Sequence, residues 1–320
     1  MTETLIEVRE LRKRFGDTRA LDGVSFVVAK GTVLGLLGPN GAGKTTTIRC
    51  LTTLLRPESG TAVVAGHDVM TDAAGVRGSI AVTGQFTALD DLLSGRENLI
   101  LFARLRGMTK AAAATRADEL LAQFDLVESA GKLVRTYSAG MQRRLDLAAS
   151  LVVEQPVLFL DEPTTGLDPR SRQVLWGTVR ELAARGTTIL LTTQYLEEAD
   201  QLADRIAVID HGTVIAEGPA AELKNHIGGR VCETTVDDET TRDRGVNALR
   251  AAGLTPSVSG SAIVIPAPDA GSIAAVVTAL AQAGIEPDDI ALRVPSLDDV
   301  FFALTGGGGG GGGALKAVSR

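Results

Sequence analysis

A glycine-rich segment near residue 40 constrains the fold more than any other part of this chain. It reads Gly38-Pro-Asn-Gly-Ala-Gly-Lys-Thr-Thr46 and fits the phosphate-binding loop pattern G-x-x-x-x-G-K-[ST] without a gap. The apolar run at 33–37 is typical of a buried parallel strand, and residues 44–51 are typical of the start of a helix. Such a loop directs free backbone N–H groups and the positive end of the helix dipole at one point, where an anion binds. A chance glycine-rich turn is the alternative, which the motifs further along the chain disfavour.

The residue types in this loop match the chemistry of a nucleoside triphosphate. Gly41 and Gly43 allow the backbone to approach a phosphate closely, Lys44 can reach the β- and γ-phosphates, and the Thr45 hydroxyl can ligate Mg²⁺. The predicted ATP-binding residues of the loop are Gly38, Asn40, Gly41, Gly43, Lys44, Thr45 and Thr46.

The second strong signal is an apolar strand that ends in two carboxylates, Val157-Leu-Phe-Leu-Asp-Glu-Pro163. Ligands bind at the carboxyl ends of the strands in open α/β sheets, so Asp161 is predicted to help hold Mg²⁺. Glu162 follows directly and is predicted to polarise the water that attacks the γ-phosphate. The alternative is an acidic strand end that only caps the next helix.

Composition limits the classes of protein that this chain can belong to. Its 320 residues suffice for one large α/β domain and a smaller one, and with only 3% aromatic residues the core must consist of Leu, Val, Ile and Ala. The net charge of −7 argues against a nucleic-acid partner. The two cysteines form no disulfide framework or metal-binding spacing. Charged residues near the start of the sequence do not fit a signal peptide. The sequence has no apolar run of about eighteen residues, so no membrane-spanning helix is predicted.

Helical patterns alternate with buried strands through the first two thirds of the chain, which predicts right-handed βαβ units. An ATP-binding domain is predicted over 1–228, with a helical subdomain at about 86–155, and a small α+β domain over 229–305. The remaining residues, 306–320, contain an unbroken glycine tract, which is either a flexible tether or a stretch of unassigned residues written as glycine. The predicted strands are 5–11, 24–29, 33–37, 61–65, 157–160, 187–192, 231–236, 262–266 and 291–294, and the predicted helices lie within 94–124 and 139–151 and after Pro169.

A third motif points to a family. The segment Tyr137-Ser-Ala-Gly-Met-Gln142 opens a helix and resembles the signature sequence of ABC-type ATPases, commonly Leu-Ser-Gly-Gly-Gln. The resemblance implies a homodimer in which Ser138 and Gly140 contact the ATP held by the other subunit. Ala139 and Met141 depart from the usual Gly and Gln, and the methyl group of Ala139 is expected to loosen the closed dimer. Taken alone, the motif also fits an N-capped surface helix.

Further family markers follow in order. Phe15 resembles the aromatic residue that stacks on adenine, although a core Phe at a strand end is an alternative. Gln85 resembles the glutamine that contacts Mg²⁺ and the attacking water, in a loop that faces the transmembrane partner. The loop at 166–168 resembles the one through which the two subunits sense each other's sites. Gln194 stands where the family usually has His, and its amide can contact the γ-phosphate without titrating, although a residue that only caps the helix beginning near Leu196 is an alternative.

Two longer segments narrow the resemblance. Residues 192–200 and 295–305 resemble the daunorubicin/doxorubicin-resistance branch of ABC exporters. This implies an α/β P-loop ABC ATPase with a mixed β subdomain, a helical subdomain and a small C-terminal α+β appendage. It further implies ATP and Mg²⁺ as cofactors, catalysis by Glu162, Gln85 and Gln194, and a metal site of Thr45, Gln85 and Asp161.

The same resemblance implies a role in transport. A homodimer would bind a separately encoded permease at the cytoplasmic face of the membrane and power the export of hydrophobic drugs or complex lipids. Two alternatives are a soluble ABC ATPase that acts on nucleic acid or ribosomes, and an ATP-binding regulatory subunit with low turnover. The acidic net charge disfavours the soluble ATPase. Ala139 and Gln194 depart from the family pattern and are therefore compatible with the low-turnover regulatory subunit.

Overall fold

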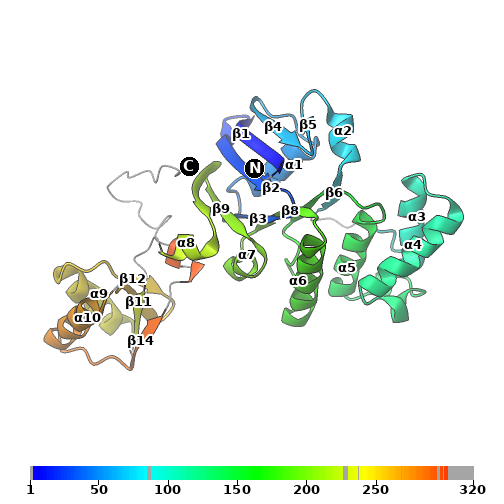
Figure 1. Ribbon diagram of the computed structural model, residues 1–320. Helices are drawn as coiled ribbons and strands as arrows, with labels where there is room; N and C mark the ends of the chain where they lie inside the picture. Colours follow the sequence, from blue (N-terminus) through cyan, green and yellow to red (C-terminus); the bar gives the residue numbers. More distant parts are fainter. Residues whose placement is uncertain are drawn as a thin grey trace. The chain divides into compact units, whose positions relative to one another are not determined.

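The computed structural model describes residues 3–84, 88–225, 230–236, 238–267, 269–293, 296–297 and 299–301 (Figure 1). Its contacts divide the chain into two compact units, 1–217 and 218–320. The short helix α8 (Ala220–Asn225) therefore falls in the second unit, which begins earlier than the boundary predicted at 228. The glycine tract predicted at 306–313 lies outside the described residues.

A six-stranded sheet forms the centre of the first unit, in the order β10-β9-β3-β8-β7-β6. The pairs β6–β7, β7–β8, β8–β3 and β3–β9 are parallel. Every residue of β3, β7 and β8 is buried, because helices or a second sheet cover both faces, and this explains the continuous apolar runs in the sequence. The strands are β3 (Val33–Leu37), β6 (Ile80–Thr83), β7 (Val157–Asp161), β8 (Thr188–Thr193), β9 (Arg205–Asp210) and β10 (Thr213–Gly218).

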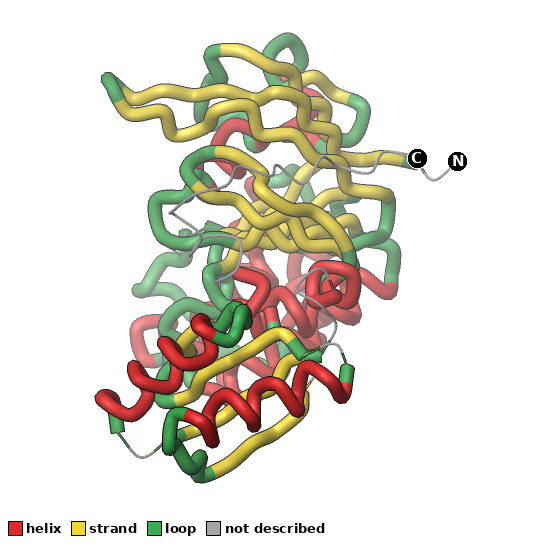
Figure 2. Tube along the Cα trace, turned by 90° about the vertical axis from the view of Figure 1, so that its left-hand side faces the viewer, coloured by secondary structure: helices red, strands yellow, loops and turns green. Residues whose placement is uncertain are grey.

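The N-terminal strands form a separate antiparallel sheet in the order β2-β1-β4-β5. Its apolar face packs with helix α1 (Lys44–Leu51) and one face of the central sheet, around side chains such as Ile6, Phe26 and Phe159. Figure 2 shows the strands of both sheets in yellow. The strands of this sheet are β1 (Thr4–Phe15), β2 (Thr18–Ala29), β4 (Ser59–Val64) and β5 (His67–Asp68).

Several helices of the first unit begin at capping residues visible in the sequence. Ser94 and Glu97 form a capping box at the start of α3, Thr109 caps α4, and Asp168 caps α6, whose first turn contains proline. Helices α3, α4 and α5 pack against one another, and with α6 they enclose a second core around Trp176 and Phe124. The helices are α2 (Ala73–Gly78), α3 (Gly95–Leu105), α4 (Lys110–Gln123), α5 (Ala139–Ser150), α6 (Pro169–Ala184) and α7 (Leu196–Leu202), with 3₁₀ turns at Val127–Ser129 and Val134–Thr136.

The second unit has its own core and a β-α-β-β-α-β order of elements. Its antiparallel sheet has the order β12-β13-β11-β14, the split arrangement of ferredoxin-like domains. Side chains from β11, β13, α9 and α10 fill the core, including Cys232, Ile263 and Leu280. The elements are β11 (Val231–Thr235), α9 (Glu239–Ala251), β12 (Ser257–Ser259), β13 (Ala262–Pro266), α10 (Ala270–Gln282) and β14 (Asp289–Arg293).

Two further properties of the described residues bear on the predictions. Both cysteines, Cys50 in α1 and Cys232 in β11, are completely buried and free, and burial raises the pKa of Cys50 to about 11. Within the described ranges, no helix has both the length and the apolar character needed to cross a bilayer.

Candidate nucleotide-binding and catalytic site

The phosphate-binding loop lies between β3 and α1, at the carboxyl edge of the central sheet. Close packing requires glycine at two of its positions. A Cβ atom on Gly38 would lie 2.2 Å from the carbonyl oxygen of Ile209 in β9, and Gly43 has a φ of +112° with the Ala20 carbonyl beside it. Gly41, by contrast, has a φ of +84° and open space where a Cβ would lie, so its turn leaves room for a ligand.

Lys44 is the first residue of α1 and is almost fully buried, with 4% of its surface exposed. Its ammonium donates to the carbonyl oxygens of Gly38 (2.7 Å) and Pro39 (2.9 Å). It also forms an ion pair with Glu162, with 3.2 Å between Nζ and Oε1. The only negative group paired with this cation within the described part of the chain is thus the predicted catalytic base. Bound phosphates would compete with Glu162 for it.

Thr45 and Asp161 lie together, as the metal prediction requires. The Thr45 hydroxyl donates to Asp161 Oδ1 over 3.2 Å, and the Thr192 hydroxyl donates to the same oxygen over 2.6 Å. A hydroxyl and a carboxylate from neighbouring elements offer the hard oxygen ligands that Mg²⁺ prefers, and they adjoin the phosphate-binding loop. The residues present therefore fit a magnesium ion that is bound together with a nucleotide.

Glu162 has an unusual backbone conformation. Its φ of +48° places a residue other than glycine in the left-handed region, which costs about 1 kcal/mol or more and is common at functional sites. Its amide donates to the carbonyl oxygen and to the hydroxyl of Thr192, each over 3.1 Å. These contacts direct the carboxylate toward Lys44 rather than along the strand.

Of the two glutamines predicted to take part in catalysis, only Gln194 lies within the described residues. Gln194 lies on the bend between β8 and α7 and is partly buried. The residue at the N-cap of α7 is Tyr195, without a side-chain cap bond, so the structure does not support a capping role for Gln194. Gln85 lies outside the described residues. The positions on either side of its segment, Gly84 and Ala88, both contact helix α5.

The signature segment begins α5. The Ser138 hydroxyl accepts from the amide of Met141 (3.3 Å) and caps the helix, while its side chain remains exposed to solvent, as does Ala139. Gly140 is buried, and a Cβ there would lie 2.4 Å from Ser171 Oγ, so packing against α6 excludes larger residues. Phe15 is 51% exposed at the end of β1, so the alternative of a core residue is wrong.

Sequence reasoning missed two residues that hold the site together. Thr192 links the two acidic residues, because its hydroxyl donates to Asp161 and accepts from the Glu162 amide. Arg143 on α5 is buried and donates to backbone carbonyls around the same strand end. A threonine at the end of an apolar strand and an arginine within a helix carry no signal of such contacts in a single sequence.

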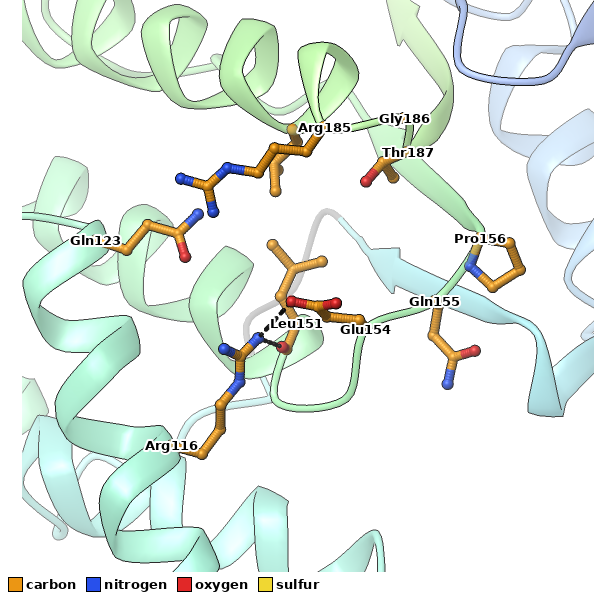
Figure 3. A pocket seen from close by; sticks show the side chains of 10 residues that line it. Arg116, Gln123, Leu151, Glu154, Gln155, Pro156, Arg185, Gly186 and Thr187 are labelled. Carbon is orange, nitrogen blue, oxygen red and sulfur yellow. Dashed lines mark hydrogen bonds and ion pairs between the residues drawn. The ribbon is translucent and has the colours of Figure 1, made fainter.

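A separate cavity of about 310 Å³ lies where β7 and β8 begin, at the edge of the sheet opposite the phosphate-binding loop (Figure 3). Arg116 closes one side of it, with Nη2 donating to the Leu151 carbonyl (2.9 Å) and lying 3.7 Å from Glu154. Ligands of open α/β sheets bind at the carboxyl ends of strands, so this cavity is not the nucleotide site.

The buried lysine, the strand-end carboxylates and the fold define a P-loop ATPase, and comparison with known proteins specifies the class. The family described as "ABC transporter" matches residues 21–165. A solved ATP-binding subunit of an ABC transporter is similar over 69% of this chain and 92% of its own, with 30% identity and a TM-score of 0.62. The ADP conformation of another ABC ATP-binding cassette matches with 26% identity and the same TM-score. The chain therefore belongs to the ABC transporter ATP-binding proteins, and the predicted fold is confirmed.

Relatives similar over almost the whole chain narrow this assignment. The daunorubicin resistance ATP-binding protein DrrA3 of Streptomyces coeruleorubidus is 54% identical over 96% of this chain and 97% of its own. The doxorubicin resistance ATP-binding protein DrrA of Mycobacterium tuberculosis is 53% identical over 94% and 93%. A Nod factor export ATP-binding protein I of Burkholderia lata is 42% identical over 94% and 97%. Within the ABC class, the chain belongs with the daunorubicin and doxorubicin resistance ATP-binding proteins, as its sequence predicts.

Proposed function

We propose that two copies of this chain bind and hydrolyse ATP at the cytoplasmic face of the membrane and power export by a separately encoded permease. The substrate class is hydrophobic drugs or complex lipids, in line with the drug-resistance names of the nearly full-length relatives. The observation that carries the proposal is the convergence of Lys44, Thr45, Asp161 and Glu162 at the carboxyl edge of the sheet.

Each of these residues has a distinct task in hydrolysis, which depends on positioning and on charge neutralisation. Lys44 and the loop amides bind the phosphates. Thr45, Asp161 and Gln85 would hold Mg²⁺, which would neutralise charge that develops on the phosphates. Once the phosphates engage Lys44, Glu162 loses its partner and becomes free to accept a proton from water. Gln194 donates a neutral hydrogen bond to the γ-phosphate.

The two remaining binding elements are exposed, as contacts to other molecules require. The exposed Ser138, with Gly140 behind it, contacts ATP in the second copy, and Phe15 presents its ring to adenine. ATP bound between the copies favours a closed dimer, and hydrolysis releases it, so nucleotide state biases the permease.

The proposal is tested by purification of the tagged chain from membranes of its own host. We expect an integral membrane protein to co-purify and efflux of a hydrophobic drug to require ATP. The Lys44→Ala variant should retain the permease and lose efflux, whereas co-purification of ribosomes or nucleic acid would overturn the proposal. The low-turnover regulatory alternative rests on Ala139 and Gln194, and a steady-state ATPase rate at background level would favour it.

A further inference from the structure

Arg143 connects the helix that follows the signature to the acidic end of β7. Its guanidinium is buried and donates four hydrogen bonds to backbone carbonyls. Nε donates to Pro163 (2.8 Å), and Nη2 donates to Asp161 (3.2 Å) and Glu162 (3.3 Å). Nη1 donates to Gly84 (2.5 Å), which directly precedes the segment of Gln85. One side chain thus contacts the backbone of Glu162 and the residue directly before Gln85, and these two are among the three predicted catalytic residues.

These bonds act where the backbone is strained. A left-handed residue other than glycine persists only when its surroundings determine its conformation, and Glu162 is such a residue. Thr192 holds its amide, and Arg143 holds the carbonyl oxygens of Asp161, Glu162 and Pro163. The direction of the Glu162 carboxylate therefore depends on the guanidinium of a different helix.

Asp146, one turn further along α5, supports the arginine and contacts the other side of the Gln85 segment. Its buried carboxylate lies 3.8 Å from Arg143 Nη1, and its Oδ1 accepts from the Ala88 amide (3.4 Å). Its Oδ2 has no hydrogen-bond partner within the described residues. Asp161 and Glu198 add further negative charge near Arg143. Helix α5 thus holds the chain both before and after residues 85–87.

We propose that Arg143 and Asp146 are positioning residues for ATP hydrolysis, which hold Glu162, Gly84 and Ala88 to the helix whose first turn contacts ATP in the second copy. The proposal rests on the proposed function, because it assigns a role in that same site. Neither residue is among those proposed to bind the phosphates. Their loss should therefore lower kcat, which depends on the placement of Glu162, and leave ATP affinity almost unchanged.

The test uses the full-length chain and three substitutions. Arg143→Lys keeps the charge but cannot form the forked set of four bonds. Asp146→Asn keeps an acceptor for the Ala88 amide and removes the charge that faces Arg143. The control is Asp125→Asn, which removes the charge from an exposed side chain that pairs with Arg144 of helix α5. ATP binding and steady-state hydrolysis are measured for each variant.

We expect Arg143→Lys to lower kcat by about 10-fold or more and Asp146→Asn to lower it by about 3-fold or more, each with KM within about 2-fold of wild type. Asp125→Asn should match wild type. A wild-type kcat in Arg143→Lys, or a raised KM with an unchanged kcat, overturns the positioning role. If Arg143→Lys fails to fold, Asp146→Asn decides, and a wild-type kcat there overturns the proposal. An inactive wild-type chain contradicts the proposed function itself, whereas an active one with unaffected variants contradicts only this inference.

Discussion

The ion pair between Lys44 and Glu162 predicts that removal of Glu162, the proposed catalytic base, tightens ATP binding. Both side chains are largely buried, and 3.2 Å separates Nζ from Oε1. Loss of one partner of a buried ion pair typically costs about 3–5 kcal/mol. In Glu162→Gln, Lys44 keeps its bonds to the Gly38 and Pro39 carbonyls, so we expect a smaller loss of about 1–3 kcal/mol in the nucleotide-free chain.

ATP reverses this penalty, because its phosphates supply the negative charge that Lys44 has lost. The variant should therefore bind ATP about 10-fold more tightly or better, since each 1.4 kcal/mol is a factor of about ten. Without nucleotide it should melt a few degrees lower, roughly 2–4 °C per kcal/mol for a domain of this size. Hydrolysis should slow by about 10²–10⁴, the usual contribution of a general base.

Calorimetric titration and thermal melting of the purified chain test this reasoning. The control is Glu154→Gln, which removes one negative charge from a side chain that is 88% exposed, and it should change neither quantity. An unchanged ATP affinity and melting temperature in Glu162→Gln would show that the pair does not compete with nucleotide. A wild-type rate of hydrolysis would show that Glu162 is not the base.

Three other residues and one truncation give further predictions. Lys44→Ala should weaken ATP binding by about 100-fold in an equilibrium titration, while Lys30→Ala, at an exposed ion pair, should not. Gln194→Ala should lower the ATPase rate by about 2–10-fold through loss of a neutral hydrogen bond, without the pH step between 6 and 8 that Gln194→His should introduce. A chain ending at residue 228 should keep its ATP affinity but dimerise less in sedimentation experiments. Burial raises the pKa of Asp146 to about 6 in the folded chain, so the folded state binds this proton more tightly than the unfolded state does, and it loses stability as pH rises toward 6. The free energy of unfolding of Asp146→Asn, measured in urea, should therefore increase by about 1.4 kcal/mol relative to that of wild type between pH 5 and pH 7.5.

The sequence predicts where the phosphate-binding loop and the acidic strand end lie in the fold, because each of these motifs is contiguous. The loop around Lys44 and the strand end at Asp161 each carry their spacing within a few residues, so the buried lysine and the paired carboxylates appear where expected. The two buried parallel strands next to them follow from apolar runs that no amphipathic element would tolerate.

Contacts between distant segments were not predictable in the same way. The bonds from Arg143 to the strand end join α5 to β7, and those of Thr192 join β8 to β7. The acceptors of Arg143 are backbone carbonyls, which every residue possesses, and a threonine in an apolar strand does not indicate which carboxylate it contacts. The ion pair of Lys44 with Glu162 is also a tertiary contact, and two motifs with separate roles give no reason to expect it.

The burial of both cysteines makes the natural chain a ready background for site-specific labelling. Cys50 and Cys232 are inaccessible, and the high pKa of Cys50 keeps its thiol protonated and unreactive at neutral pH. A single cysteine introduced at an exposed position away from the site, such as Thr115, would react with a maleimide or nitroxide reagent without prior removal of the native thiols. Distances between two labelled copies, measured by electron spin resonance with and without ATP, would then report whether the proposed dimer closes in otherwise unmodified protein.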